Sequence, residues 1–125
     1  MPANNEELVK YLTQLIETTN SGKMKWVKEN PTTFTWTTNN PRPARIIVQK
    51  VDRQRRVQSI AGFVSQTFST YVFQVIEPNT NIQRLSIDEP SDPELQKVLG
   101  ALYSCVQSSI LQSGVDFLKS ILPGS

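Results

Sequence analysis

Apolar residues recur at helical spacing near the N-terminus. Leu8, Leu12 and Leu15 return every three or four residues, which places them on one face of a helix. Asn4 or Asn5 lies just ahead of this stripe, where a short polar side chain can cap the first turn. The pattern predicts an amphipathic helix at the start of the chain.

A second, longer helix is predicted near the C-terminus. Residues 91–94 (SDPE) offer an N-cap, a proline at the first helical position and an acid in the first turn. Gly114 leaves two alternatives open, since the helix either bends there or gives way to a separate helical segment or interaction tail over residues 113–125. The apolar stripe consists of Leu95, Val98, Leu99, Leu102, Val106 and Ile110, and it resumes with Val115, Leu118 and Leu122.

Between these segments, apolar residues alternate with polar ones, which is typical of half-buried strands. Asn30-Pro31 and residues 77–81 are rich in turn-forming residues, so a hairpin is predicted around each. Residues 52–70 allow a short helix, a strand or a loop, and these alternatives stay open. The predicted strands are residues 23–28, 33–38, 45–51, 71–76 and 82–87.

The order of helix, about five strands and helix predicts an α+β fold. In this fold an N-terminal helix precedes an antiparallel meander of about five strands, and a long C-terminal helix packs on one sheet face. A chain of 125 residues has the size of one compact domain, so residues 1–125 are interpreted as a single α+β domain.

Histidine is absent and cysteine occurs once, as Cys105. The chain therefore lacks the residues for a zinc site of the usual His/Cys kind, a Ser-His-Asp triad or a Cys–His pair. Turn and capping roles are favoured for Asp88, Glu89 and Asp92 over acid catalysis or cation binding. We expect a protein that is not an enzyme, with no catalytic residue, no metal site and no cofactor.

No run of about 18 apolar residues occurs, and the N-terminal sequence MPANNEELVK lacks the features of a signal peptide. A lone cysteine cannot form an intrachain disulfide, and a buried, inert thiol is favoured for it. We therefore expect a cytoplasmic protein without a membrane-spanning segment.

Basic residues are concentrated in one part of the sequence. The chain has 13 basic and 11 acidic residues, a net charge of +2, but residues 23–56 hold nine basic and two acidic ones, which gives +7 there and −5 in the remainder. The densest part, VDRQRRVQS at residues 51–59, is predicted to lie at a hairpin tip. The candidate contacts for a polyanion or an acidic partner are Arg42, Arg45, Lys50, Arg53, Arg55 and Arg56.

Two other interpretations of this charge stay open. Basic side chains also occur on exposed strand edges, where they prevent pairing with other chains. Alternatively, the basic segment pairs with acids of the terminal helices, such as Glu6 and Glu94, within the domain or across a dimer. Trp26 and Trp36 are close to the basic residues in sequence, and core packing is favoured for them over stacking on bases.

The block LTQLIETTNSGKMKW, residues 12–26, resembles the start of a loose group of small uncharacterised bacterial proteins. In that group a helix is followed by a T-x-x-G-K-x-x-W-like turn into an antiparallel sheet, and a closing helix carries an L-x-x-L-Y sequence. The resemblance implies architecture and supplies no catalytic residue. The matching residues are Thr19, Gly22, Lys23 and Trp26, with Leu99, Leu102 and Tyr103 in the closing helix.

The C-terminal apolar stripe is longer than a sheet face needs, which predicts a surface buried by a partner or a second copy. We therefore expect a protein–protein interaction module, either a homo-oligomer or a subunit of a larger bacterial or phage-related assembly. The alternative is a nucleic-acid-binding accessory protein that uses residues 42–56, and a small-molecule pocket lined by Trp26, Trp36 and Phe73 ranks third. The predicted association residues are Ile110, Leu111, Val115, Phe117, Leu118 and Leu122.

Overall fold

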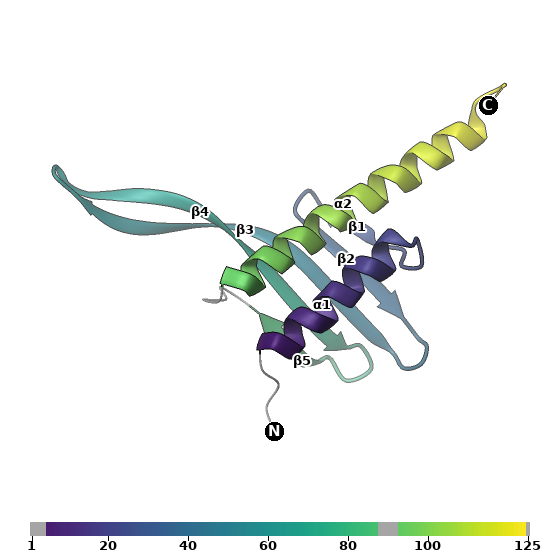
Figure 1. The fold of residues 1–125 in the computed structure, drawn as a ribbon, viewed down its shortest axis with the longest axis horizontal. Helices are drawn as coiled ribbons and strands as arrows, with labels where there is room; N and C mark the ends of the chain where they lie inside the picture. The colour runs from purple at the N-terminus through teal and green to yellow at the C-terminus, as the bar shows by residue number, and fades with distance from the viewer. Residues whose placement is uncertain (1–4, 88–92, 125) are drawn as a thin grey trace.

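The computed structural model describes residues 5–87 and 93–124, and within them it contains two helices and a five-stranded antiparallel sheet (Figure 1). Each strand pairs with its neighbour in sequence, so the sheet is a meander in the order β1-β2-β3-β4-β5. This arrangement confirms the predicted α+β fold. The elements are α1 (Asn5–Asn20), β1 (Val27–Asn30), β2 (Thr33–Thr38), β3 (Ala44–Ser59), β4 (Gly62–Glu77), β5 (Ile82–Ile87) and α2 (Pro93–Ile121).

Both helices cover the same face of the sheet (Figure 1). Residues that are paired across neighbouring strands share a sheet face, so a row of apolar pairs makes a continuous floor for the core. This row takes one residue from each of β2 to β5: Phe34, Val48, Phe73 and Ile87. The residues of α2 that are completely buried in the same core cluster are Leu99, Leu102 and Val106.

The helix α2 approaches β4 closely at Gly100. A Cβ atom at this position would lie 3.2 Å from Cε2 of Tyr71, which is tighter than an ordinary van der Waals contact. Tyr71 in turn stacks at an angle on Tyr103, with their ring centroids 5.4 Å apart. The glycine therefore allows the N-terminal half of α2 to lie directly on the aromatic side chains.

The connection from α1 to β1 is closed by a buried hydrogen bond between side chains. The indole Nε1 of Trp26 donates to Oγ1 of Thr19 over 3.1 Å, and both residues are buried. Gly22 lies between them with φ of +79°, a conformation that glycine adopts without steric cost. The strand predicted over residues 23–28 is misplaced, because residues 23–26 form the connection that ties Trp26 back to α1, and β1 runs from Val27 to Asn30.

The segment left open by the sequence, residues 52–70, belongs to two long strands. β3 and β4 stay paired down to Ser59 and Gly62, whereas β2 pairs with β3 only up to Gln49 and β5 pairs with β4 only from Phe73. Beyond these points the two strands leave the sheet as a ribbon (Figure 1). We call residues 52–59 and 62–69 the β3–β4 arm.

The C-terminal helix also leaves the body of the domain (Figure 1). It is continuous through Gly114, and its 29 residues span about 44 Å, nearly twice the length of α1. All residues from 111 to 122 are exposed. We call residues 111–122 the distal segment. Within the described residues, no helix is long and apolar enough to cross a membrane.

Several predictions from the sequence concern residues outside the described ranges. They are the N-cap at Asn4, the cap formed by Ser91 and Asp92, and the turn role of Asp88 and Glu89. The helix after that cap does begin at Pro93, as predicted from its position.

Candidate interaction surfaces

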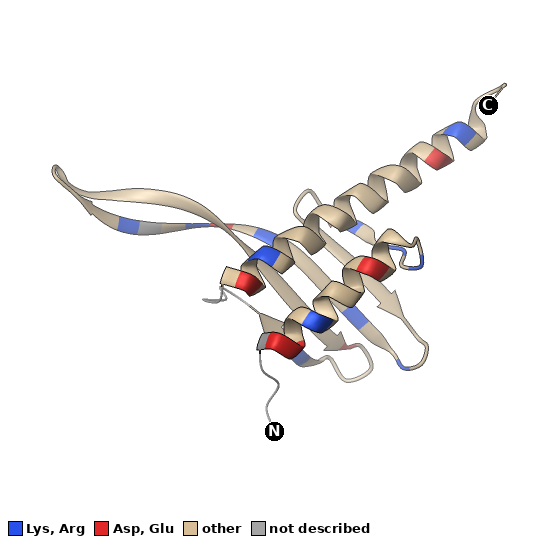
Figure 2. Cartoon of the chain, viewed as in Figure 1, with Lys and Arg blue, Asp and Glu red and all other residues tan. Residues whose placement is uncertain are grey.

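The structure does not bring the six predicted basic residues into one patch (Figure 2). Arg42 and Arg45 lie where β3 begins, and Arg42 lines a shallow cleft with Glu77. Arg53 lies eight residues further along β3, which is about 26 Å in an extended strand. The basic residues therefore form two separate groups with Lys50 between them.

The second group lies along the β3–β4 arm and not at its tip, so the predicted tip position of VDRQRRVQS is wrong. β3 continues to Ser59 and β4 begins at Gly62, so Ile60 and Ala61 make the turn. Gly62, directly after the turn, adopts φ of +117°. Ile60 in this turn is completely exposed, and Phe63 and Val64 of β4 are 65% and 50% exposed.

Side-chain contacts between its strands organise the arm. Near its base, Oγ of Ser69 donates a hydrogen bond to Oδ1 of Asp52 over 2.7 Å. Further out, the guanidinium of Arg56 lies 5.1 Å from the ring centroid of Phe63, at cation–π distance. Arg53 is half-buried and Arg56 is exposed. The arm thus carries arginines on both faces of the ribbon, Arg53 on one and Arg56 on the other, and cross-strand contacts hold it.

The distal segment contains five of the six predicted association residues, and all five are exposed. The sixth, Ile110, is half-buried and packs against the core cluster. The sequence interpretation missed Ile121, which is 59% exposed and lies one helical turn after Phe117. That spacing was the signal that could have identified it.

Exposed apolar side chains occupy one side of the distal segment. Successive helical residues are about 100° apart, so these side chains fall within an arc of about 160°. The opposite side carries Gln112, Asp116 and Lys119, and the Nε2 of Gln112 donates to Oδ1 of Asp116 over 2.9 Å. No charged residue occurs between Lys97 and Asp116 (Figure 2). The exposed apolar residues are Leu111, Val115, Phe117, Leu118, Ile121 and Leu122.

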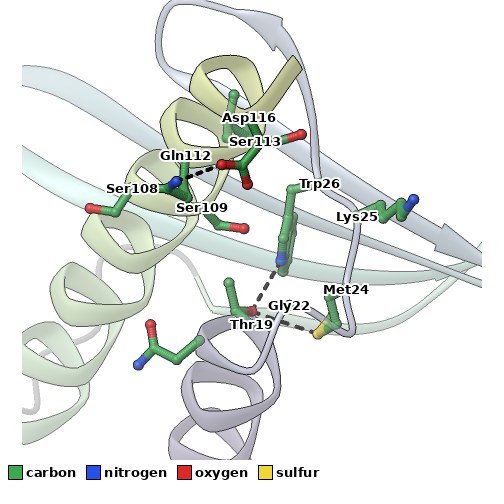
Figure 3. Close-up of a pocket in the computed structure, with 12 residues that line it drawn as sticks. Thr19, Gly22, Met24, Lys25, Trp26, Ser108, Ser109, Gln112, Ser113 and Asp116 are labelled. Carbon is green, nitrogen blue, oxygen red and sulfur yellow. Dashed lines mark hydrogen bonds between the residues drawn. The ribbon is translucent and has the colours of Figure 1, made fainter. Parts of the chain in front are cut away.

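A polar cleft of about 510 Å³ lies where α2 leaves the body, beside the α1–β1 connection (Figure 3). Its inner wall includes Trp26 and Thr19, whose hydroxyl also approaches Sδ of Met24 at 3.7 Å. Ser109 and Asp116 line it from α2. The polar groups of these side chains are partnered or solvated, so the cleft has no buried group that calls for a ligand.

The single cysteine lies near this cleft and is not an activated nucleophile. Sγ of Cys105 donates to Oδ1 of Asn20 over 2.8 Å, and burial raises the pKa of the thiol. A raised pKa keeps the sulfur protonated at neutral pH, whereas a reactive cysteine needs the thiolate. Among the described residues, no group of three His, Cys, Asp or Glu side chains is placed to hold a metal ion.

The small-molecule pocket predicted from Trp26, Trp36 and Phe73 does not form as one cavity. Trp26 lines the polar cleft, whereas Phe73 lines an apolar groove of about 430 Å³ between α1 and the sheet. Trp36 lines neither cavity and packs against the core, half-buried. The three aromatic residues therefore do not share a ligand site.

Comparisons of the chain with models of protein families, with curated proteins and with solved structures find no match. The function is therefore argued from the two surfaces that leave the body, the distal segment of α2 and the β3–β4 arm. Each combines high exposure with a composition that differs from that of an ordinary solvated surface.

Proposed function

We propose that this protein is a non-enzymatic association module that forms a homodimer through its distal segment. The observation that carries the proposal is a helix that runs past the sheet with six exposed apolar side chains on one side. A monomer gains nothing from such a face, because exposed apolar area is unfavourable in water.

The size of the face supports burial against an equally apolar surface. Its side chains are between 37% and 70% exposed. At roughly 1.5–3 kcal/mol for complete burial of such a side chain, burying the exposed part yields about 1 kcal/mol each. One copy then contributes about 6 kcal/mol and a pair about 12 kcal/mol, against roughly 4–15 kcal/mol for the loss of translational and rotational freedom. The gain from two apolar faces is thus comparable with the cost of association, whereas the gain from one face lies at the lower end of that cost.

The chemistry of the apolar face favours a second copy of the chain as the partner. Twofold pairing is the commonest form of homo-oligomer, and it places the same patch of each copy against the other. An antiparallel pair of distal segments places Leu111 opposite Leu122 of the second copy. Asp116 and Lys119, the charged residues of the distal segment, lie on its opposite side and stay in water.

Leu118→Asp tests this proposal by placing a charge in the middle of the apolar face. The wild type is expected at about 28 kDa by light scattering after size exclusion, twice the chain mass of 14.1 kDa, and the variant at the mass of one chain. The matched control is Ser120→Asp, which adds the same charge on the polar side of the same helix and should leave the dimer intact.

The circular dichroism spectrum should be the same for both variants, since residues 111–122 contribute nothing to the core cluster. A wild type that runs as a single chain at about 100 μM would contradict the proposal. If both variants had the mass of one chain, the added charge alone, and not the apolar face, would control association.

A further inference from the structure

The β3–β4 arm is a ribbon of two strands with no third strand beside it. Each strand of the arm has eight residues, which is about 26 Å of extended chain. An isolated two-stranded ribbon is only marginally stable in water, and its outer edges present unpaired backbone groups. The core cluster contains no residue of the arm. The arm therefore adds nothing to the core of the domain, which indicates a surface that binds a partner.

The composition of the arm is basic and rich in hydrogen-bonding side chains. From Arg53 to Ser69 there are three arginines and no acid. Between and around the arginines are uncharged side chains that both donate and accept hydrogen bonds: Gln54, Gln58, Ser65, Gln66 and Thr67. The chemistry along the arm is thus that of a cationic surface which can also read polar groups.

The small net charge of the chain does not cancel the charge of the arm. The acids of α1 and Glu94 of α2 lie on the body, and the nearest acid in sequence, Asp52, lies at the base of the arm (Figure 2). Arg56 is four residues beyond Asp52, about 13 Å along the strand. At physiological salt the screening length is about 8 Å, so an approaching anion responds mainly to the arginines.

We propose that the β3–β4 arm binds double-stranded DNA by entering its major groove. The major groove is about 12 Å wide and admits a two-stranded ribbon. Arginine binds phosphates and guanine edges, and glutamine binds adenine edges, so the residue types of the arm match both kinds of contact. The exposed large apolar side chains, Ile60, Phe63 and Val64, lie toward the end of the arm, and a lipid surface that received them would leave Arg53, nearer the base, without a partner.

Duplex RNA fits the arm less well than duplex DNA. The major groove of RNA is deep and narrow, and side chains cannot reach its base edges. The geometry of the ribbon therefore distinguishes the two nucleic acids, although both carry the same phosphate charge. This proposal is independent of the distal segment, which the arm variants leave unchanged.

The first test measures the salt dependence of binding to a fluorescent DNA duplex of about 24 base pairs by anisotropy. If three arginines contact phosphates, the dissociation constant should rise roughly 40-fold between about 50 and 200 mM salt. In Arg55→Gln/Arg56→Gln the slope of log K against log salt should fall by about two, and binding at low salt should weaken at least tenfold. The matched control, Arg42→Gln/Arg45→Gln, removes the same charge at the other end of β3 and should change affinity less than threefold.

A second variant removes the arm altogether. Val51 and Thr70 are directly paired, so an Asn-Gly turn can join them in place of residues 52–69. The shortened protein should keep its helical circular dichroism signal and cooperative unfolding, and should lose DNA binding.

Four outcomes would overturn the proposal. They are no binding of wild type to duplex DNA at about 50 mM salt, equal loss in the two arginine pairs, equal binding of an RNA duplex of the same length, and binding to anionic phospholipid vesicles without binding to DNA. The last result would assign the arm to a lipid surface through its apolar tip.

Discussion

The hydrogen bond between Trp26 and Thr19 is expected to hold the start of the sheet against α1. In Thr19→Val the indole N–H of Trp26 stays buried and loses its acceptor at 3.1 Å. A buried donor without a partner costs about 1–3 kcal/mol, more than the roughly 1 kcal/mol that a hydrogen bond contributes net. Valine has nearly the size of threonine, so little of the effect comes from lost packing.

A double-mutant cycle separates the hydrogen bond from its surroundings. Trp26→Phe removes the N–H together with part of the ring, so this variant loses stability mainly through packing. In that background Thr19→Val should cost less than about 0.5 kcal/mol, because no unpaired donor remains. The expected coupling between the two residues is therefore about 1 kcal/mol or more.

The free energies of unfolding would be measured by urea titration at one protein concentration, since association would add to apparent stability. Thr13→Val is the control, because the Thr13 hydroxyl is exposed and donates to the Val9 carbonyl of the same helix over 2.7 Å. This change should cost no more than about 0.5 kcal/mol. The reasoning fails if Thr19→Val costs the same in the wild-type and Trp26→Phe backgrounds.

Two further predictions concern the core and the pH dependence of stability. Leu99→Ala, at a fully buried position of α2, should lower the free energy of unfolding by about 2–5 kcal/mol. Leu111→Ala, on the exposed distal segment, should change the stability of the isolated chain by less than about 0.5 kcal/mol. Denaturant titration of dilute protein measures both values. Burial raises the pKa of Cys105, and burial followed by the nearby Tyr71 raises that of Tyr103. Because the folded state holds these protons more tightly, the free energy of unfolding should fall as pH rises through the ordinary thiol and phenol ranges. Cys105→Ser should make this fall with pH less steep. A dependence on pH identical to that of the wild type would refute the contribution of the thiol.

The helices and the two hairpins could be predicted because their signals are local. A stripe such as Leu95 and Leu99 requires only the helical period, and Asn30-Pro31 marks a turn by its own backbone preferences. The arm has no such signal. Its strands bury little apolar surface, so the alternation that reveals a strand is weak between Arg53 and Ser69, and the pairing that makes them strands is visible only in the folded chain.

The two candidate surfaces also differ in how well the sequence could predict them. Along a helix, residues three or four apart return to one face, so neighbours such as Val115 and Leu118 in the sequence stay neighbours in space. Along a strand each residue advances about 3.3 Å, so basic residues that are close together in the sequence are spread along the strand. This is why five of the predicted association residues share one surface, whereas Arg42 and Arg56 lie at different ends of β3.

The positions of the two surfaces decide how the two proposals relate. The arm and the distal segment leave the body in opposite directions (Figure 1). A pair joined through the distal segments would therefore leave both arms uncovered, and each copy would keep the whole surface that we propose for DNA. Dimerisation would then add only the effective concentration of a second arm and no new contact, so loss of the dimer should weaken binding to a long duplex while binding by a single arm to a short one should persist. The two proposals thus assign association and DNA binding to separate elements, each of which extends beyond the core.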